Sequence, residues 1–196
     1  MKRIAFAVLI SLSALLSGCL FPEKFTAKVS INPDGTYSTV FDGTVAHVPA
    51  LIQAATTKRP LSDKDTAEMQ REAAKLAKNP NVKQATYLGN GRFNMAIEGK
   101  HKAGARSNLM DIIKVSTDKA GIITITSTQL KDKDKAQLRE LGLAVSGTLD
   151  VVLPRNAEII SSNTTSSPSL FGLFGTYSWK IGSIDDVPMM KIRLAK

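Results

Sequence analysis

The chain has 196 residues and a formal net charge of +9, with 26 Lys and Arg residues against 17 Asp and Glu. Its length allows one domain with a substantial hydrophobic core, and its charge favours anionic partners. The single cysteine excludes an internal disulfide, and together with only two histidines it leaves too few ligands for a Cys/His metal or redox site.

The first segment has the pattern of a secretory signal peptide. Two basic residues precede an apolar run over residues 4–16 that only two serines interrupt. The run is shorter than the roughly 20 residues that a membrane-spanning helix needs, and it matches the hydrophobic region of a signal peptide, about 7–15 residues. We predict that residues 1–18 form a signal peptide and that cleavage falls between Gly18 and Cys19.

Residues 16–19, Leu-Ser-Gly-Cys, resemble the lipobox of bacterial lipoproteins. The resemblance implies that the Cys19 thiol carries a diacylglyceryl group and that its amine becomes the mature N-terminus, with palmitate among the expected acyl chains. Two or more chains anchor a protein lastingly, whereas a single chain binds a membrane weakly. An ordinary signal peptide followed by an incidental cysteine is the alternative.

These features predict a place in the bacterial cell envelope. By resemblance to enterobacterial sorting rules, Leu20 in place of an Asp after the cysteine implies the outer membrane, with the protein facing the periplasm. Residues 19–24 are expected to be a lipidated tether. The expected partners are the membrane, through the acyl chains, and an envelope protein or an anionic lipid. Nucleic acid is not expected, since a secreted lipoprotein seldom meets it.

Residues 25–46 have the pattern of a β-hairpin. Apolar residues alternate with polar ones from Phe25 to Ile31, which is typical of a half-buried strand. The sequence Asn-Pro-Asp-Gly at residues 32–35 is a strong turn signal. On the return strand Gly43 interrupts the alternation and predicts a bulge.

Two helices are expected after this hairpin, whereas residues 48–60 are weakly helical at best. Ser62 and Asp65 form a capping pattern that predicts the main helix over residues 62–79, with an apolar stripe that packs on a sheet. A short charged helix is predicted over residues 132–141, because Gly142 provides a stop signal.

Alternating apolar residues and turn signals predict further strands, and residues 99–106 between two of them read as a basic loop. Strands joined by tight turns with two inserted helices predict an α+β fold with mainly antiparallel β-sheet. Residues 25–196 are expected to form a single domain, with a subdomain junction near residues 129–142 as an alternative. The further strands are expected at residues 82–88, 93–97, 109–117, 121–128, 143–153, 157–162, 176–181 and 188–194.

The C-terminal third resembles the LppM-type lipoprotein domain. Leu153-Pro154 at the end of a strand, Asn163 after the next strand and Trp179-Lys180 in a later strand match its pattern. The mature chain also resembles proteobacterial envelope lipoproteins with an LFGLFG stretch before the tryptophan strand. The resemblance implies an anchored envelope domain that touches lipid, and it does not imply an enzyme.

Catalytic and metal-binding residue patterns are missing from the sequence. His47 lies beside apolar residues at a strand end, and His101 lies in the basic stretch, which would repel a cation. Asp185 and Asp186 are adjacent carboxylates that are expected to face water in a turn. Neither a G-x-S-x-G elbow nor a complete dinucleotide-binding glycine pattern occurs. We therefore expect no catalytic residue, no metal and no cofactor.

Two segments are candidates for contact with a membrane or a partner. The first is apolar and follows a polar lead, so it either forms an exposed contact patch or folds back onto a sheet. The second is basic and either contacts anionic groups or is solvated. The apolar residues are Leu170, Phe171, Leu173 and Phe174, and the basic ones are Lys100, Lys102 and Arg106.

The sequence thus predicts a membrane-anchored envelope lipoprotein of binding or structural type, without catalytic activity. The alternative is a periplasmic carrier of lipid or glycolipid. A cavity between sheet and helix with room for acyl chains would favour the carrier.

Overall fold

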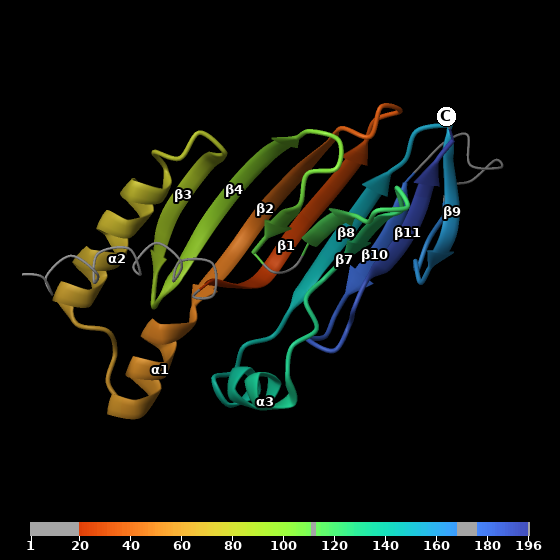
Figure 1. The fold of residues 1–196 in the computed structure, drawn as a ribbon. Coiled ribbons are helices and arrows are strands. Elements are labelled where there is room, and N and C mark those ends of the chain that lie inside the picture. Colours follow the sequence, from red (N-terminus) through yellow and green to blue (C-terminus); the bar gives the residue numbers. More distant parts are fainter. Residues whose placement is uncertain (1–19, 111–112, 168–175, 196) are drawn as a thin grey trace, which may run out of the picture.

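The computed structural model describes residues 20–110, 113–167 and 176–195, in which two β-sheets and three helices confirm the predicted α+β fold (Figure 1). The predicted signal peptide, Gly18, Cys19 and the apolar stretch from Leu170 to Phe174 lie outside the described residues. Among the described residues, no helix is long and apolar enough to cross a membrane.

The first sheet has six strands in the order β10-β8-β1-β2-β4-β3. Neighbouring strands are antiparallel except β1 and β8, which run parallel although more than a hundred residues separate them. The strands are β1 (Leu20–Ile31), β2 (Tyr37–His47), β3 (Val82–Gly89), β4 (Arg92–His101), β8 (Ser146–Val152) and β10 (Tyr177–Ile181).

The second sheet has five antiparallel strands in the order β5-β6-β7-β11-β9. The helix α3 (Asp132–Glu140) lies in the connection from the second sheet back to β8 of the first. The strands are β5 (Ser107–Leu109), β6 (Ile113–Thr117), β7 (Ile123–Thr126), β9 (Ala157–Ser162) and β11 (Met189–Leu194).

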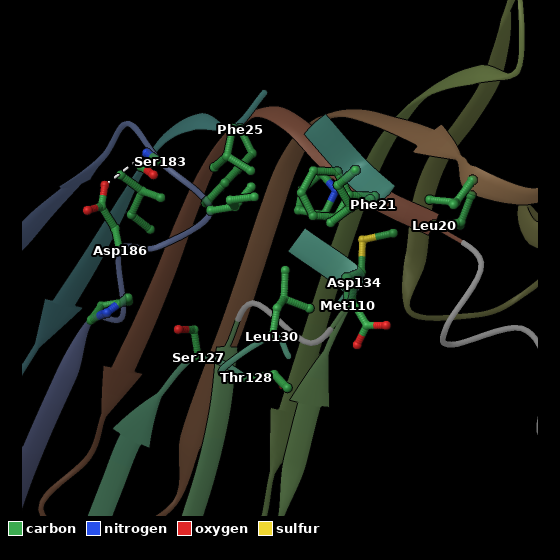
Figure 2. A pocket seen from close by; sticks show the side chains of 17 residues that line it. Leu20, Phe21, Phe25, Met110, Ser127, Thr128, Leu130, Asp134, Ser183 and Asp186 are labelled. Atoms are coloured by element: carbon green, nitrogen blue, oxygen red, sulfur yellow. Dashed lines mark hydrogen bonds between the residues drawn. The ribbon is translucent and has the colours of Figure 1, made fainter. Parts of the chain in front are cut away.

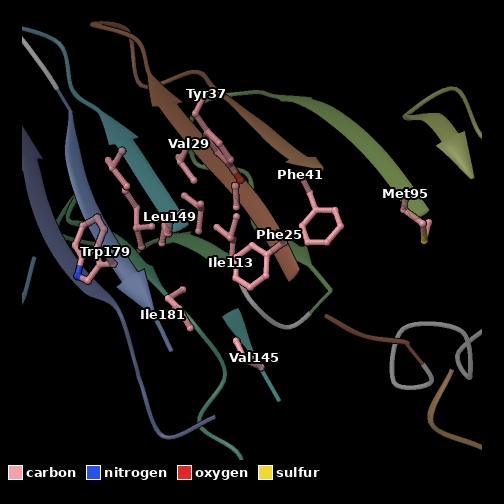
Figure 3. Packing of buried hydrophobic residues seen from close by; sticks show 14 of the residues in the cluster. Phe25, Val29, Tyr37, Phe41, Met95, Ile113, Val145, Leu149, Trp179 and Ile181 are labelled. Atoms are coloured by element: carbon pink, nitrogen blue, oxygen red, sulfur yellow. The ribbon is translucent and has the colours of Figure 1, made fainter. Parts of the chain in front are cut away.

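A single hydrophobic cluster contains residues of both sheets (Figure 3). Every second residue of a strand points to the same face of its sheet. The inward-facing side chains of the two sheets pack against one another in this cluster. Phe41 and Leu149 of the first sheet and Ile113 and Ile125 of the second are almost fully buried. The second sheet therefore packs on the β1–β8–β10 half of the first, and α2 (Asp63–Leu76) contributes Met69 beside β3 (Figure 1).

The main helix confirms its predicted start and ends earlier than expected. The Ser62 hydroxyl accepts a hydrogen bond from the Asp65 amide, and the Asp65 carboxylate accepts one from the Ser62 amide, which is a complete capping box. The helix ends at Leu76, where the chain tightens into a turn before the predicted stop near residue 79. The charged helix α3 has the predicted start and ends one residue early.

The expectation that residues 48–60 are weakly helical at best is wrong. They contain α1 (Val48–Thr57), which starts at His47, whose Nδ1 accepts a hydrogen bond from the Ala50 amide. Histidine is not among the residues that usually cap a helix N-terminus, so the start was not recognisable in the sequence. Lys58 ends the helix in the left-handed conformation, with φ of 53°.

Several strand boundaries also differ from the prediction. Residues 109–117, expected as one strand, contain the end of β5 and the whole of β6. The strand β4 continues through His101, so the basic loop is confined to residues 102–106. The strand β1 begins at Leu20 rather than at Phe25, so residues 20–24 are strand and not a free tether. An irregularity between Pro22 and Lys24 shifts the register there, which breaks the alternation that the sequence shows downstream. The predicted bulge at Gly43 is thus found on the facing strand instead.

Candidate functional site

A pocket of about 270 Å³ opens at the end of the two-sheet structure where β1 begins (Figure 2). Its walls come from β1, α3, the residues before β8 and the segments that follow β5, β7 and β10. Most of the lining is apolar, including Leu20, Phe21, Phe25, Leu138 and Val145. Protein interiors rarely leave such space empty, and apolar cavities of about 150 Å³ already accept benzene-sized ligands. The geometry suits a segment of hydrocarbon chain.

Phe25 shapes the inner wall of this pocket. Its ring stacks on Phe41 with centroids 5.7 Å apart. The same ring covers Gly147 of β8, where an added Cβ would come within 2.8 Å of three ring atoms. On the other side, the backbone of β1 approaches Gly43 so closely that a Cβ there would collide with the Lys24 carbonyl. Two glycines thus leave room for Phe25, Gly147 for its ring and Gly43 for its backbone and Cβ.

A charged pair holds the start of β1 in place. Arg92 of β4 donates from Nε to Glu23 Oε2 at 2.8 Å and from Nη2 to Glu23 Oε1 at 3.0 Å. Two parallel bonds of this kind fix geometry as well as contributing energy. The Glu23 side chain is only 16% exposed and the Arg92 side chain 35% exposed. The pair therefore ties the pocket-lining segment of β1 to the sheet across β2.

Polar side chains also contribute to the pocket lining. Asp134 comes from α3 and Asp186 from the connection between β10 and β11. Asp186 Oδ2 accepts hydrogen bonds from the amides of Gly182 and Ser183. The hydroxyl of Ser127, which follows β7, is buried and has no hydrogen-bond partner in the structure. An unpaired buried hydroxyl is costly, so this residue lowers the stability of the pocket wall.

Asp185 and Asp186 are exposed, as expected, and each has a structural role. Lys135 Nζ lies 2.8 Å from Asp185 Oδ1, and Arg139 Nη2 lies 2.7 Å from Asp185 Oδ2. The hydrogen bond and charge of Lys135 hold the pKa of Asp185 below its usual value. These contacts attach α3 to the loop beside the pocket. They do not create a pair of carboxylates available for acid–base chemistry.

The two histidines serve structure in this fold. His47 caps α1, and His101 stacks on Tyr37 with ring centroids 4.5 Å apart. His101 Nε2 lies 3.1 Å from the hydroxyl of Thr39, and burial lowers the pKa of this imidazole. Within the described ranges, no group of three His, Cys, Asp or Glu side chains is placed to hold a metal ion.

The basic candidates lie toward the other end of the sheet from Leu20, although Arg106 is only four residues from Met110, which lines the pocket. Lys100 is near the end of β4, and Lys102 and Arg106 follow it in the loop. The end of β4 pairs with the start of β2, whereas the pocket lies at the end of β2 and the start of β1. The full length of β1, about 3.3 Å for each of its residues, separates the two ends. The basic group is therefore at the opposite end of the sheet from Leu20.

Two of the matching positions of the C-terminal third, Asn163 and Trp179, meet in space. The Trp179 indole Nε1 donates to Asn163 Oδ1 at 2.8 Å, and the Met189 amide donates to the same oxygen. Asn163 Nδ2 in turn donates to the Val187 carbonyl. One asparagine thus joins β9, β10 and β11, which is a role in architecture.

The pocket itself was not recognised in the sequence. The sequence predicts a tether for Leu20, Phe21 and Pro22, because the strand alternation begins only at Phe25. Val145 falls in the predicted strand over residues 143–153, but no pattern shows that its neighbours leave space. The available signal was the apolar character of three consecutive residues directly after Cys19.

No protein family model and no curated protein sequence matches the chain. Among solved structures, the chain is similar to the folded domain of LppM from Mycobacterium tuberculosis, which was determined by NMR. The identity is 16%, the TM-score is 0.39, and the similarity covers 90% of this chain and 92% of that chain. The ligand and the role of the present protein have to be sought in its own residues.

Proposed function

We propose that the protein is a lipid-anchored envelope lipoprotein that works by binding, and that the pocket beside Leu20 holds the hydrocarbon part of a lipid. The sequence supports the anchor through its basic start, its short apolar run and the lipobox ending at Cys19. The proposed location is the outer membrane, facing the periplasm. In this proposal the protein is not an enzyme.

The position of the pocket carries the proposal. Leu20 and Phe21 line it, and they directly follow the residue that is expected to carry the acyl chains. An anchor at Cys19 would keep the mouth of the pocket close to the bilayer surface. Lipid would then have a short path from the membrane into an apolar site. The volume, about 270 Å³, is just below the common range for ligand sites and suits part of one chain rather than a whole lipid.

The basic group of Lys100, Lys102 and Arg106 is proposed as a contact for anionic groups away from the anchoring bilayer. It lies at the end of the sheet opposite Leu20, so it would face away from the membrane that holds the anchor. Phosphate groups on another envelope component fit this position. Salt would weaken such a contact, because exposed charges are screened within about 10 Å at 0.1 M.

Native mass spectrometry of the full-length protein, released from its own membranes in mild detergent, tests the pocket. We expect a bound lipid in addition to the covalent acyl chains. Val145→Phe places a ring in the pocket and should reduce the bound lipid several-fold. Val152→Phe, at the far end of the strand β8 that follows Val145 and outside the pocket lining, should retain it.

Leu138→Phe fills the pocket from α3 and provides a second blocking variant if Val145→Phe does not fold. Thermal unfolding of each variant reports whether it folds. The absence of bound lipid from the wild-type protein would contradict the proposal, as would equal amounts on the wild type and on a folded blocking variant.

A further inference from the structure

The mouth of the pocket carries charge of one sign. Among the described residues that line it, Asp134 and Asp186 are the charged ones, and none is Lys, Arg or His. Both carboxylates belong to exposed residues, so they lie at the opening rather than on the apolar floor. Figure 2 shows them on opposite sides of the pocket. A head group that emerges from the pocket would pass between them.

The cations of α3 closest in sequence to Asp134 do not cancel this charge at the opening. Lys133 does not line the pocket, and Lys135 and Arg139 both bind Asp185, which is not a lining residue either. The overall charge of +9 attracts anions from a distance, but salt screens it beyond about 8–10 Å. The two lining carboxylates are therefore the charges that a bound head group meets first.

Ser127 is also a lining residue, but its hydroxyl oxygen is buried and does not face the pocket opening. The carboxylates at the opening only accept hydrogen bonds, so head groups rich in donors suit them.

From this arrangement we infer that the pocket selects an amphiphile whose head group is uncharged or positively charged and donates hydrogen bonds. It discriminates against a free carboxylate head group. This inference rests on the proposed function, in which the same pocket holds the hydrocarbon chain. It differs from what the net charge of the chain alone would indicate, which is a preference for anionic lipid.

The test uses three photoreactive amphiphiles with the same alkyl chain and different head groups: a primary amine, a glucoside and a carboxylate. Each is added to the full-length protein in phosphatidylcholine nanodiscs, and labelled peptides are quantified by mass spectrometry. Peptides that line the pocket should be labelled about three- to tenfold more by the amine and the glucoside than by the carboxylate. Asp134→Asn should reduce the preference for amine over carboxylate by about two- to fivefold.

Asp132→Asn is the matched control, because Asp132 lies in the same first turn of α3 but does not line the pocket. It should leave the preference unchanged. Equal labelling by all three probes, stronger labelling by the carboxylate, or the same effect from both variants would overturn the inference and leave the proposed function standing. If no probe labels the pocket, the proposed function fails and the inference fails with it.

Discussion

Phe25 shows how single residues decide the shape of the pocket. Its ring lies over Gly147 because that position has no side chain, and its backbone approaches Gly43 for the same reason. Aromatic rings that cover sheet glycines in this way recover contacts that a glycine cannot make itself. The inner wall of the pocket therefore depends on two residues that contribute no side chain.

Gly147→Ala should lower the free energy of unfolding by about 1–3 kcal/mol, because the new methyl group displaces the Phe25 ring from a packed site. Gly182→Ala is the control, since an added Cβ there meets nothing within 4 Å. Chemical denaturation of the two variants measures the difference. Equal stabilities would show that the ring moves without cost.

His101 should make the stability of the fold depend on pH. Burial lowers its pKa below the usual histidine value of about 6.5, so the unfolded chain takes up the proton first as the pH falls. The free energy of unfolding should therefore decrease as the pH drops through about 6.5, and stop decreasing once the folded imidazole also titrates. Thermal unfolding between neutral and mildly acidic pH measures this effect.

His101→Phe keeps an aromatic ring against Tyr37 and cannot titrate, so it is the matching variant. It should lose the part of the pH dependence that the wild type shows near pH 6.5. An identical pH profile for both proteins would contradict the assignment to His101.

At the scale of elements, the start of β1 is held by the pair between Glu23 and Arg92. Arg92→Met leaves a largely buried carboxylate without its partner, and should cost about 1–3 kcal/mol. The amides near Leu20 should also exchange hydrogen faster, since this segment would open locally. Denaturation and hydrogen exchange measure the two effects.

The exposed pair of Lys83 and Glu98 provides the comparison. Its atoms are 3.9 Å apart and its side chains are 53% and 58% exposed, so Lys83→Met should cost less than about 1 kcal/mol. If both substitutions had the same small effect, the pair at Glu23 would not hold the strand.

The elements also show what the sequence could reveal. The helix α2 was predictable because its start is encoded locally by Ser62 and Asp65, and the first hairpin because Asn32–Gly35 encodes its turn. The helix α1 was missed because an imidazole caps it, and the first residues of β1 because a bulge interrupts their alternation. Local capping and turn signals thus predicted α2 and the first hairpin. An unusual cap concealed α1, and a bulge concealed the start of β1.

At the scale of the whole molecule, the order of the strands in the sheets could not be predicted from the sequence pattern. The parallel pairing of β1 with β8 joins segments that are distant in the chain, and no local signal encodes it. That pairing brings Val145 and α3 to the start of β1 and so creates the pocket. The candidate site is thus a property of topology, and only its apolar residues were visible beforehand.

The same topology gives the molecule two ends of different character. An apolar pocket lies next to the expected anchor, and a basic group lies at the far end of the sheet. An acyl anchor would orient such a molecule, with the pocket toward the bilayer and the basic end away from it. The position of both proposed contacts relative to the membrane therefore depends on the acylation of Cys19.

The most direct test is the mass of the N-terminal peptide of the protein isolated from the membranes of its own host. The account predicts that this peptide begins at Cys19 and carries a diacylglyceryl group on its sulfur. A peptide that retains residues 1–18, or that begins at an unmodified Cys19, would contradict it.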